Sequence, residues 1–87
     1  MPQAYAIEYY RSVKKDLRKI DHQNRVLIVE KIQSLANNPR PSGVSKLQDA
    51  GNLYRIRVGD YRIVYEIIDK RLVITIVKVG HRSRIYN

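Results

Sequence analysis

A glycine–aspartate pair, Gly59-Asp60, separates two segments in which apolar and polar residues alternate. Glycine at the first central position of a two-residue turn favours a type II′ β-hairpin. The turn then fixes the pairing of the two strands, beginning with Val58 opposite Tyr61. Because successive side chains of a strand point to opposite faces, one face is apolar and carries Tyr54, Ile56, Val58, Tyr61, Ile63 and Tyr65. The other face carries Arg55, Arg57 and Arg62.

The three arginines on one face are the first functional signal. In the predicted register Arg57 lies directly opposite Arg62, and like charges in that position cost stability. Violations of this kind are expected where a protein binds something, and guanidinium groups match phosphate oxygens in geometry. We therefore interpret Arg55, Arg57 and Arg62 as a phosphate-binding surface. The alternative is that these side chains extend into water or are partly neutralised by Glu66 and Asp60.

The remaining segments complete an α+β fold in a single domain, residues 1–87. Residues 4–9 alternate weakly and predict a first strand. Ser12 and Asp21 are candidate N-caps of two helices, and both helices have apolar residues at helical spacing, namely Val13, Leu17 and Ile20 in the first and Ile28, Ile32 and Leu35 in the second. The expected order is an N-terminal strand, a two-helix hairpin, and a C-terminal antiparallel β-meander that packs on the helices. A short strand at 44–47 is also possible.

The last strand is expected at Leu72–Val79, after a two-residue turn at Asp69-Lys70. This register places Leu72, Ile74 and Ile76 opposite Ile67, Tyr65 and Ile63. It also places Val64, Thr75, Val77 and His81 around the arginines.

The charge balance narrows the function classes. Lys and Arg number 17 against 8 Asp and Glu, a formal net charge of +9. Such an excess on a small surface attracts polyanions. Nucleic acid is the leading partner, with an anionic membrane, an acidic protein or mere solubility as alternatives. No apolar run approaches the roughly 18–20 residues of a membrane span, so we expect a cytoplasmic protein that does not act in a membrane. The absence of cysteine excludes disulfides and thiolate chemistry.

The C-terminal segment adds a second cluster of candidate residues. We expect Gly80 to turn the chain so that His81, Arg82, Arg84 and Tyr86 gather at the edge of the arginines. Histidine is suited to proton transfer near neutral pH, and tyrosine can stack on a base. The alternative is that each residue has an ordinary structural role: His81 as a surface histidine, the arginines as solvated charges, and Tyr86 as a side chain that closes the end of the core. No carboxylate pair or metal-ligand cluster is visible, so no cofactor or metal is expected.

Segments 54–65 and 79–86, together with 14–17 and Lys46-Leu47, resemble the RelE branch of the RelE/ParE toxin superfamily. The resemblance covers essentially the whole chain. It implies a ribosome-dependent endoribonuclease that cleaves mRNA in the ribosomal 30S A site by attack of the 2′-hydroxyl on the scissile phosphate. It further implies an acidic, RelB-like antitoxin that can assemble with the toxin into a heterotetramer. A ParE-like inhibitor of DNA gyrase and a basic RNA- or ribosome-binding module are the alternatives, and the histidine–tyrosine tail argues against the first.

The resemblance also implies roles for individual residues. Arg62, Arg82 and Tyr86 match catalytic positions of the family. Arg55 and Arg57 fall where relatives carry basic residues, often lysines, and arginine stays protonated because its pKa lies above about 12. Neither can serve as general base, which leaves His81 as the expected proton-transfer residue of a metal-independent reaction. The residues expected to bind RNA or phosphate are Lys46, Arg55, Arg57 and Arg84.

Overall fold

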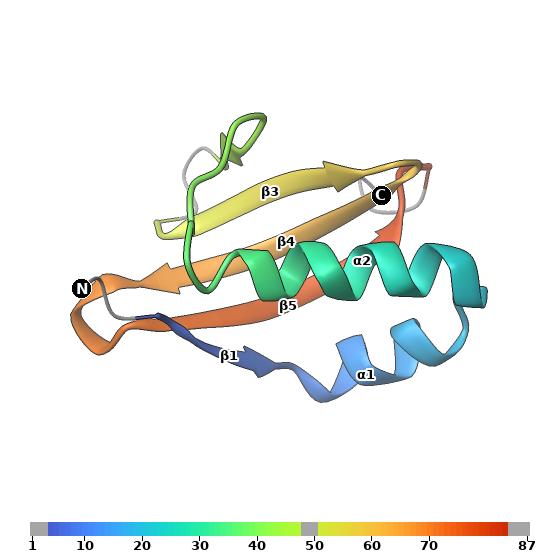
Figure 1. Cartoon of the computed structure of the whole chain (residues 1–87), viewed down its shortest axis with the longest axis horizontal. Coiled ribbons are helices and arrows are strands. Elements are labelled where there is room, and N and C mark those ends of the chain that lie inside the picture. The colour runs from blue at the N-terminus through green and yellow to red at the C-terminus, as the bar shows by residue number, and fades with distance from the viewer. Residues whose placement is uncertain (1–3, 48–50, 84–87) are drawn as a thin grey trace.

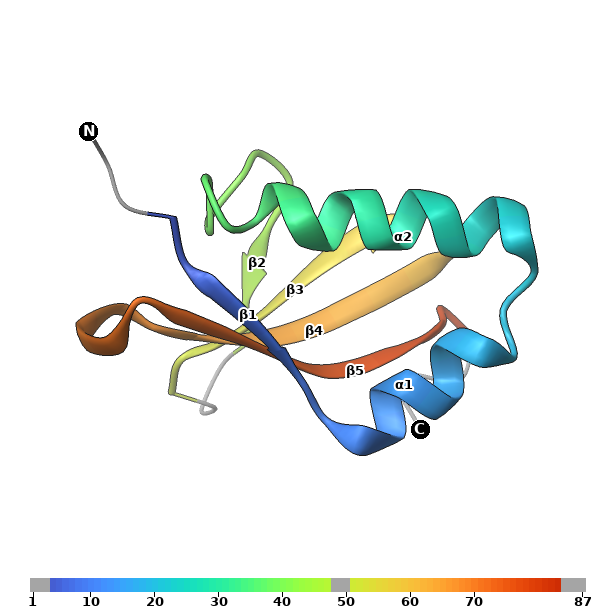
Figure 2. The ribbon, with the colours of Figure 1, turned by 60° about the horizontal axis from the view of Figure 1, so that its bottom comes forward.

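The computed structural model describes residues 4–47 and 51–83 and has an α+β fold (Figure 1). Its elements are β1 (Ala6–Tyr9), α1 (Arg11–Arg18), α2 (His22–Ser34), β2 (Ser45–Lys46), β3 (Leu53–Val58), β4 (Tyr61–Ile68), a 3₁₀ turn (Asp69–Arg71) and β5 (Val73–His81). The strands form a five-stranded sheet in the order β1-β5-β4-β3-β2. Strand β1 runs parallel to β5, and the other pairs are antiparallel. In Figure 2, α2 lies over the strands and α1 lies beside β5. Both helices contribute to the core formed with one face of the sheet, so the predicted fold class is confirmed.

The second helix begins as the sequence predicts. The side chain of Asp21 accepts hydrogen bonds from the backbone and side-chain nitrogens of Asn24, at 3.2 and 2.9 Å. These bonds, led by the side-chain one, lower the pKa of Asp21. Along the helix Ile28, Ile32 and the following Leu35 are fully buried, which confirms the predicted apolar stripe.

The first helix begins earlier than predicted. Tyr10 precedes it in an extended conformation, and the carbonyl of Tyr10 accepts from the N–H groups of Val13 and Lys14 at 3.0 and 3.4 Å. Tyr10 also donates its own N–H to the carbonyl of Ile76 at 3.0 Å. Pairing with β5 therefore carries the chain directly into the helix, and the prediction of Ser12 as N-cap is wrong because Ser12 already lies in the first turn.

The hairpin of β3 and β4 has the predicted register, from Val58 opposite Tyr61 to Tyr54 opposite Tyr65. Gly59 has a φ of 58°, and Asp60 has no positive φ, which fits the type II′ turn. The apolar face of this hairpin packs on the helices. The shared core contains Val13, Ile20, Ile28, Ile32, Leu35, Tyr54, Ile56, Ile63, Tyr65, Ile67, Ile74, Ile76 and Val79.

The connection from β4 to β5 differs from the prediction. Instead of two residues it uses the 3₁₀ turn and Leu72, which adopts a left-handed φ of 54°. Ile67 therefore faces Ile74, and Leu72 lies outside the strand pairing. The carbonyl of Leu72 accepts from the N–H of Ala6 at 2.8 Å. The N-terminal strand thus helps to shape this turn, and a rule for isolated hairpins does not include that contact.

A β-bulge then changes which side chains of β5 point to each face. Tyr65 pairs with Ile76, but Val64 pairs with Lys78, so Val77 is the additional residue. Beyond the bulge Val79 is 2% exposed and belongs to the core. A bulge re-aims side chains and is common beside functional sites. Here it overturns the prediction that His81 lies beside the arginines, because His81 pairs with Tyr61 on the apolar face.

The end of the sheet near the β4–β5 turn holds a cluster of polar bonds that we call the tyrosine clamp: Tyr5, Arg40, Tyr54, Tyr65 and Asp69. Asp69 accepts from the Tyr5 hydroxyl at 2.6 Å and from Arg40 Nη2 at 2.9 Å. Arg40 also donates from Nε to the Tyr54 hydroxyl at 3.2 Å and lies over the Tyr54 ring, 5.2 Å from its centroid. Tyr65 donates its hydroxyl to the carbonyl of Pro39 at 2.7 Å. The clamp thereby joins β1, the α2–β2 loop, β3 and the β4–β5 turn.

Within residues 4–47 and 51–83, no helix is long and apolar enough to cross a membrane.

Candidate nucleic-acid interface

The sheet face opposite the helices carries the predicted arginine cluster. Arg57 lies directly opposite Arg62, and Arg55 lies two residues before Arg57 on the same strand. We call Arg55, Arg57 and Arg62 the arginine face. Their placement together confirms the geometry inferred from the turn at Gly59.

Arg62 is the most informative of the three because its side chain is only 8% exposed. A charged group is rarely buried unless its charge is compensated by hydrogen bonds or opposite charge. The positive charge of Arg57 on the neighbouring strand adds to this cost. An anion bound between Arg57 and Arg62 would offset this repulsion.

A shallow hollow opens at these side chains. It is lined by Arg55, Arg57 and Arg62, and by Gly43 and Ser45 from the loop that leads into β2. Ser45 pairs with Arg55, so its hydroxyl lies on the arginine face. Three guanidinium side chains and a hydroxyl around one hollow suit a phosphate group, whose oxygens accept several hydrogen bonds at once.

His81 lies on the other side of the sheet. It pairs with Tyr61, and the two rings meet edge to face with centroids 5.6 Å apart and an angle of 79° between planes. Its Nδ1 lies 2.9 Å from Ser83 Oγ and accepts the backbone N–H of Ser83 at 3.3 Å. The expected position among the arginines is therefore wrong, because the bulge turns His81 toward the helix side.

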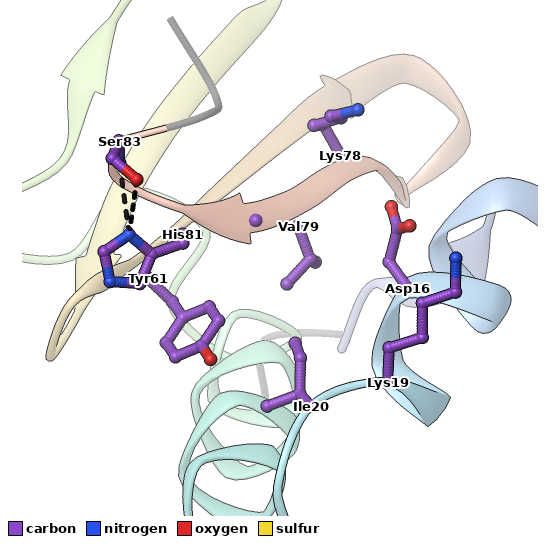
Figure 3. Close-up of a pocket in the computed structure, with 9 residues that line it drawn as sticks. Asp16, Lys19, Ile20, Tyr61, Lys78, Val79, His81 and Ser83 are labelled. Carbon is purple, nitrogen blue, oxygen red and sulfur yellow. Dashed lines mark hydrogen bonds between the residues drawn. The ribbon is translucent and has the colours of Figure 1, made fainter.

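His81 borders a pocket of about 600 Å³ between α1 and the end of the sheet (Figure 3). Its other lining residues are Asp16, Lys19, Ile20, Tyr61, Lys78, Val79, Gly80 and Ser83. Figure 3 shows Val79 directed toward Ile20, whereas Lys78 extends on the other side of β5. The pocket and the arginine face are thus the two sides of the same end of the sheet.

The other residues predicted for the site lie at different places in the structure. Lys46 pairs with Tyr54, so it does not share the arginine face, and its neighbour Ser45 takes that place. Arg82 is exposed and donates its backbone N–H to the carbonyl of Asp60 at 2.8 Å, which fixes it beside the β3–β4 turn. Arg84 and Tyr86 lie outside the described residues.

Two residues on the arginine side of β5 differ from the sequence analysis: Lys78 was not considered, and Gly80 was expected to turn the chain but lies within β5. Lys78 pairs with Val64 and Gly80 pairs with Arg62, and both therefore face the same side as the arginines. A signal was present: alternation continued from the apolar Ile76 would put Lys78 on the core face and Val79 outside. Such a break in the pattern indicates that a bulge shifts the faces beyond it.

In the part of the chain that the structure describes, no three His, Asp or Glu side chains are grouped so that they could hold a metal ion.

Comparison with known proteins identifies the class. The family model described as "ParE toxin of type II toxin-antitoxin system, parDE" matches residues 7–86, nearly the whole chain. The protein therefore belongs to the RelE/ParE superfamily of type II toxins.

Its similarity to individual proteins points to the RelE-type members of this superfamily. A RelE-like toxin protein of Escherichia coli is 32% identical over 88 residues, which cover 95% of this chain and 90% of that protein. The mRNA interferase toxin RelE of Escherichia coli strain K12 is 29% identical over 83 residues, with 93% and 86% covered. Toxin RelE in the archaeal RelE–RelB complex of Pyrococcus horikoshii has the same fold, with a TM-score of 0.83, 32% identity, and 93% and 98% covered.

Proposed function

We propose that this protein is an mRNA endoribonuclease that inhibits translation by cutting message in the ribosomal A site. The observation that carries the proposal is the arginine face, where a nearly buried Arg62 lies opposite Arg57 at a hollow that also includes Arg55. The names of its relatives, among them an mRNA interferase, support RNA as the anion.

In the proposed reaction the 2′-hydroxyl attacks the adjacent phosphate, and the bond from phosphorus to the 5′-oxygen breaks. The guanidinium groups of the arginines hold the phosphate and stabilise the negative charge that develops on its oxygens. In this proposal the ribosome orients the substrate. It presents the message in a fixed position, and such positioning lowers the barrier by several kcal/mol.

We assign His81 to proton transfer in this reaction. Its ring lies on the helix side of the sheet, one residue beyond Gly80, so this role requires the RNA to bend around the end of β5 from Arg62 to His81. Its Nδ1 is engaged by Ser83, so Nε2 is the nitrogen left to meet the substrate. Arg82 is proposed to contact the phosphate from the turn. The roles of Arg84 and Tyr86, in RNA binding and in base stacking or proton relay, rest on the family resemblance alone.

We further propose an acidic antitoxin as the partner that holds the toxin inactive in the cytoplasm. The formal charge of +9 favours an acidic chain that wraps the domain. Solved complexes of RelE with RelB support the pairing. A heterotetramer with two copies of each chain is the assembly we propose to test by light scattering on the co-expressed pair.

The test is cleavage mapping on a reporter message in a translating extract, with and without ribosomes. Wild type is compared with Arg62→Ala and His81→Ala, and with Arg71→Ala, which removes an exposed arginine from the β4–β5 turn. We expect ribosome-dependent cuts with wild type and Arg71→Ala only. Intact message with active wild-type protein would refute the nuclease.

A second candidate is inhibition of DNA gyrase, because the matching family model is described as a ParE toxin. A supercoiling assay with purified gyrase separates the two functions. Inhibition of supercoiling together with intact message in the extract would favour this candidate.

A further inference from the structure

The β5 side of the arginine face carries a residue that local structure does not require. Gly80 lies within β5, pairs with Arg62 and has no positive φ, so an L-residue fits its backbone. A Cβ at this position would meet no atom of the described residues within 4 Å. Glycine weakens a strand, and it often marks a place where another molecule approaches closely.

The same side of β5 presents a cation two residues earlier. Lys78 is exposed and pairs with Val64, which in turn pairs with Arg55. One row across the sheet therefore reads Arg55, Val64, Lys78, and the next reads Arg57, Arg62, Gly80. Val64 therefore lies between the two cations of its row, and Gly80 lies beside Arg62 at the end of the next row.

We propose that Lys78 and Gly80 extend the proposed nuclease site into a path for the RNA backbone. Gly80 leaves the space through which the sugar–phosphate chain reaches Arg62, and Lys78 binds a phosphate that neighbours the scissile one. Strands β3 and β5 flank β4, so their axes are about 10 Å apart, which gives Arg55 and Lys78 separate phosphates. The inference rests on the proposed function, since it concerns the same RNA.

The charge of Lys78 alone would fit an ordinary solvated lysine. The bulge argues otherwise, because regular pairing continued from Tyr65 and Ile76 would place Val77 opposite Val64 and Val79 opposite Arg62. The bulge instead buries Val79 in the core and presents Lys78 and Gly80 beside the arginines. One local irregularity thus produces both the open space and the extra cation.

The test compares Gly80→Ala, Gly80→Val and Lys78→Ala with two controls distant from the arginines. Ala6→Val adds bulk to an exposed position of β1, and Lys70→Ala removes an exposed lysine from the β4–β5 turn. Cleavage rates are measured in the translating extract. Binding is measured by fluorescence anisotropy with a 2′-deoxy RNA analogue that cannot be cut, at several salt concentrations.

We expect Gly80→Ala to lower cleavage about 10-fold and Gly80→Val about 100-fold, the range over which displaced positioning acts, with an unchanged or higher Tm. Lys78→Ala should weaken binding and reduce the salt slope by roughly 0.7, the loss of one contact to single-stranded nucleic acid. Both controls should behave as wild type. Wild-type rates and binding in Gly80→Val and Lys78→Ala would overturn the path.

The outcomes also separate this inference from the proposed function. If wild type binds the analogue but cuts nothing, the nuclease fails, and loss of binding in Gly80→Val still supports the path. If wild type neither binds nor cuts, both proposals fall.

Discussion

The two ends of the sheet use arginine in opposite ways. In the tyrosine clamp, Arg40 forms an ion pair of 2.9 Å with Asp69, bonds the Tyr54 hydroxyl and lies over the Tyr54 ring. On the arginine face, Arg62 is buried opposite Arg57 in a hollow lined by cations. The comparison shows that an arginine surrounded by acceptors of its own chain stabilises the fold. On the arginine face the neighbour across the strand pair is another arginine, and we propose that this face binds an anion from outside the chain.

From this difference we expect the tyrosine clamp to contribute to stability and the arginine face to contribute to function. Substitutions in the clamp should lower thermal stability and leave cleavage intact. Substitutions on the arginine face should remove cleavage and leave the fold intact, or even strengthen it. Each substitution below tests one side of this division.

The largest expected effect is the loss of cleavage in Arg62→Ala. Removal of a donor that stabilises transition-state charge typically costs about 10²- to 10³-fold in rate. Cleavage of the reporter message should fall by at least about 100-fold, while far-ultraviolet circular dichroism stays that of the folded protein.

Arg62→Lys sharpens this result, because it keeps the charge and removes the planar fork. We expect it to recover only a small part of the rate. Full activity in Arg62→Ala would show that the arginine face is not the site.

The next effect belongs to the clamp and concerns stability. Tyr65 is fully buried, and burial raises the pKa of its hydroxyl to about 12. Tyr65→Phe leaves the Pro39 carbonyl without this donor, which costs about 1–3 kcal/mol. For a domain of this size the Tm should fall by roughly 4–8 °C for each kcal/mol. Tyr10→Phe, at a position 49% exposed, is the matched control and should keep the Tm of wild type. The Tm of both variants is measured by calorimetry. A lower Tm in Tyr65→Phe with unchanged cleavage would support the division between stability and function.

Sequence reasoning succeeded where local rules govern. The glycine turn gave the register of β3 and β4 and hence the arginine face, and Asp21 gave the start of α2. In both places a short-range preference and the burial of the apolar side chains agree. The order of the elements followed from the same local patterns.

It failed where distant parts of the chain decide. The turn at Asp69 is held by Tyr5 and Arg40, which are far from it in sequence. The bulge at Val77 serves the burial of Val79 against the helices. Because a shift of one residue exchanges the two faces of a strand, His81 was expected among the arginines and Lys78 was overlooked. Gly80 was expected to turn the chain, but it lies within β5.

A smaller effect should appear as a pH dependence of the clamp. The hydrogen bonds from Arg40 and then Tyr5 lower the pKa of Asp69 in the folded protein. A depressed pKa contributes stability above the unfolded value, about 3.9 for aspartate, and this is lost as pH falls through the folded value. The Tm of wild type should therefore exceed that of Asp69→Asn near neutral pH, and the gap should close below about pH 4.

Melting curves of both proteins from about pH 7 to about pH 2.5 provide the measurement. A gap that stays constant across this range would mean that the charge of Asp69 is not what holds the clamp.

The smallest effect tests the cost of the arginine face directly. Arg57 is exposed and directly opposite Arg62, so their repulsion destabilises the empty protein. Arg57→Gln keeps a polar side chain with the same three carbons and removes the repulsion, which should raise stability by about 0.2–1 kcal/mol at low salt. Because salt screens the repulsion, the gain should shrink as ionic strength rises. The same variant should cleave more slowly, since the phosphate loses a ligand. The free energy of unfolding is measured by denaturant titration at two salt concentrations, with Arg71→Ala as the control. A loss of stability in Arg57→Gln would mean that Arg57 supports the fold as Arg40 does. The contrast between the two ends of the sheet would then disappear.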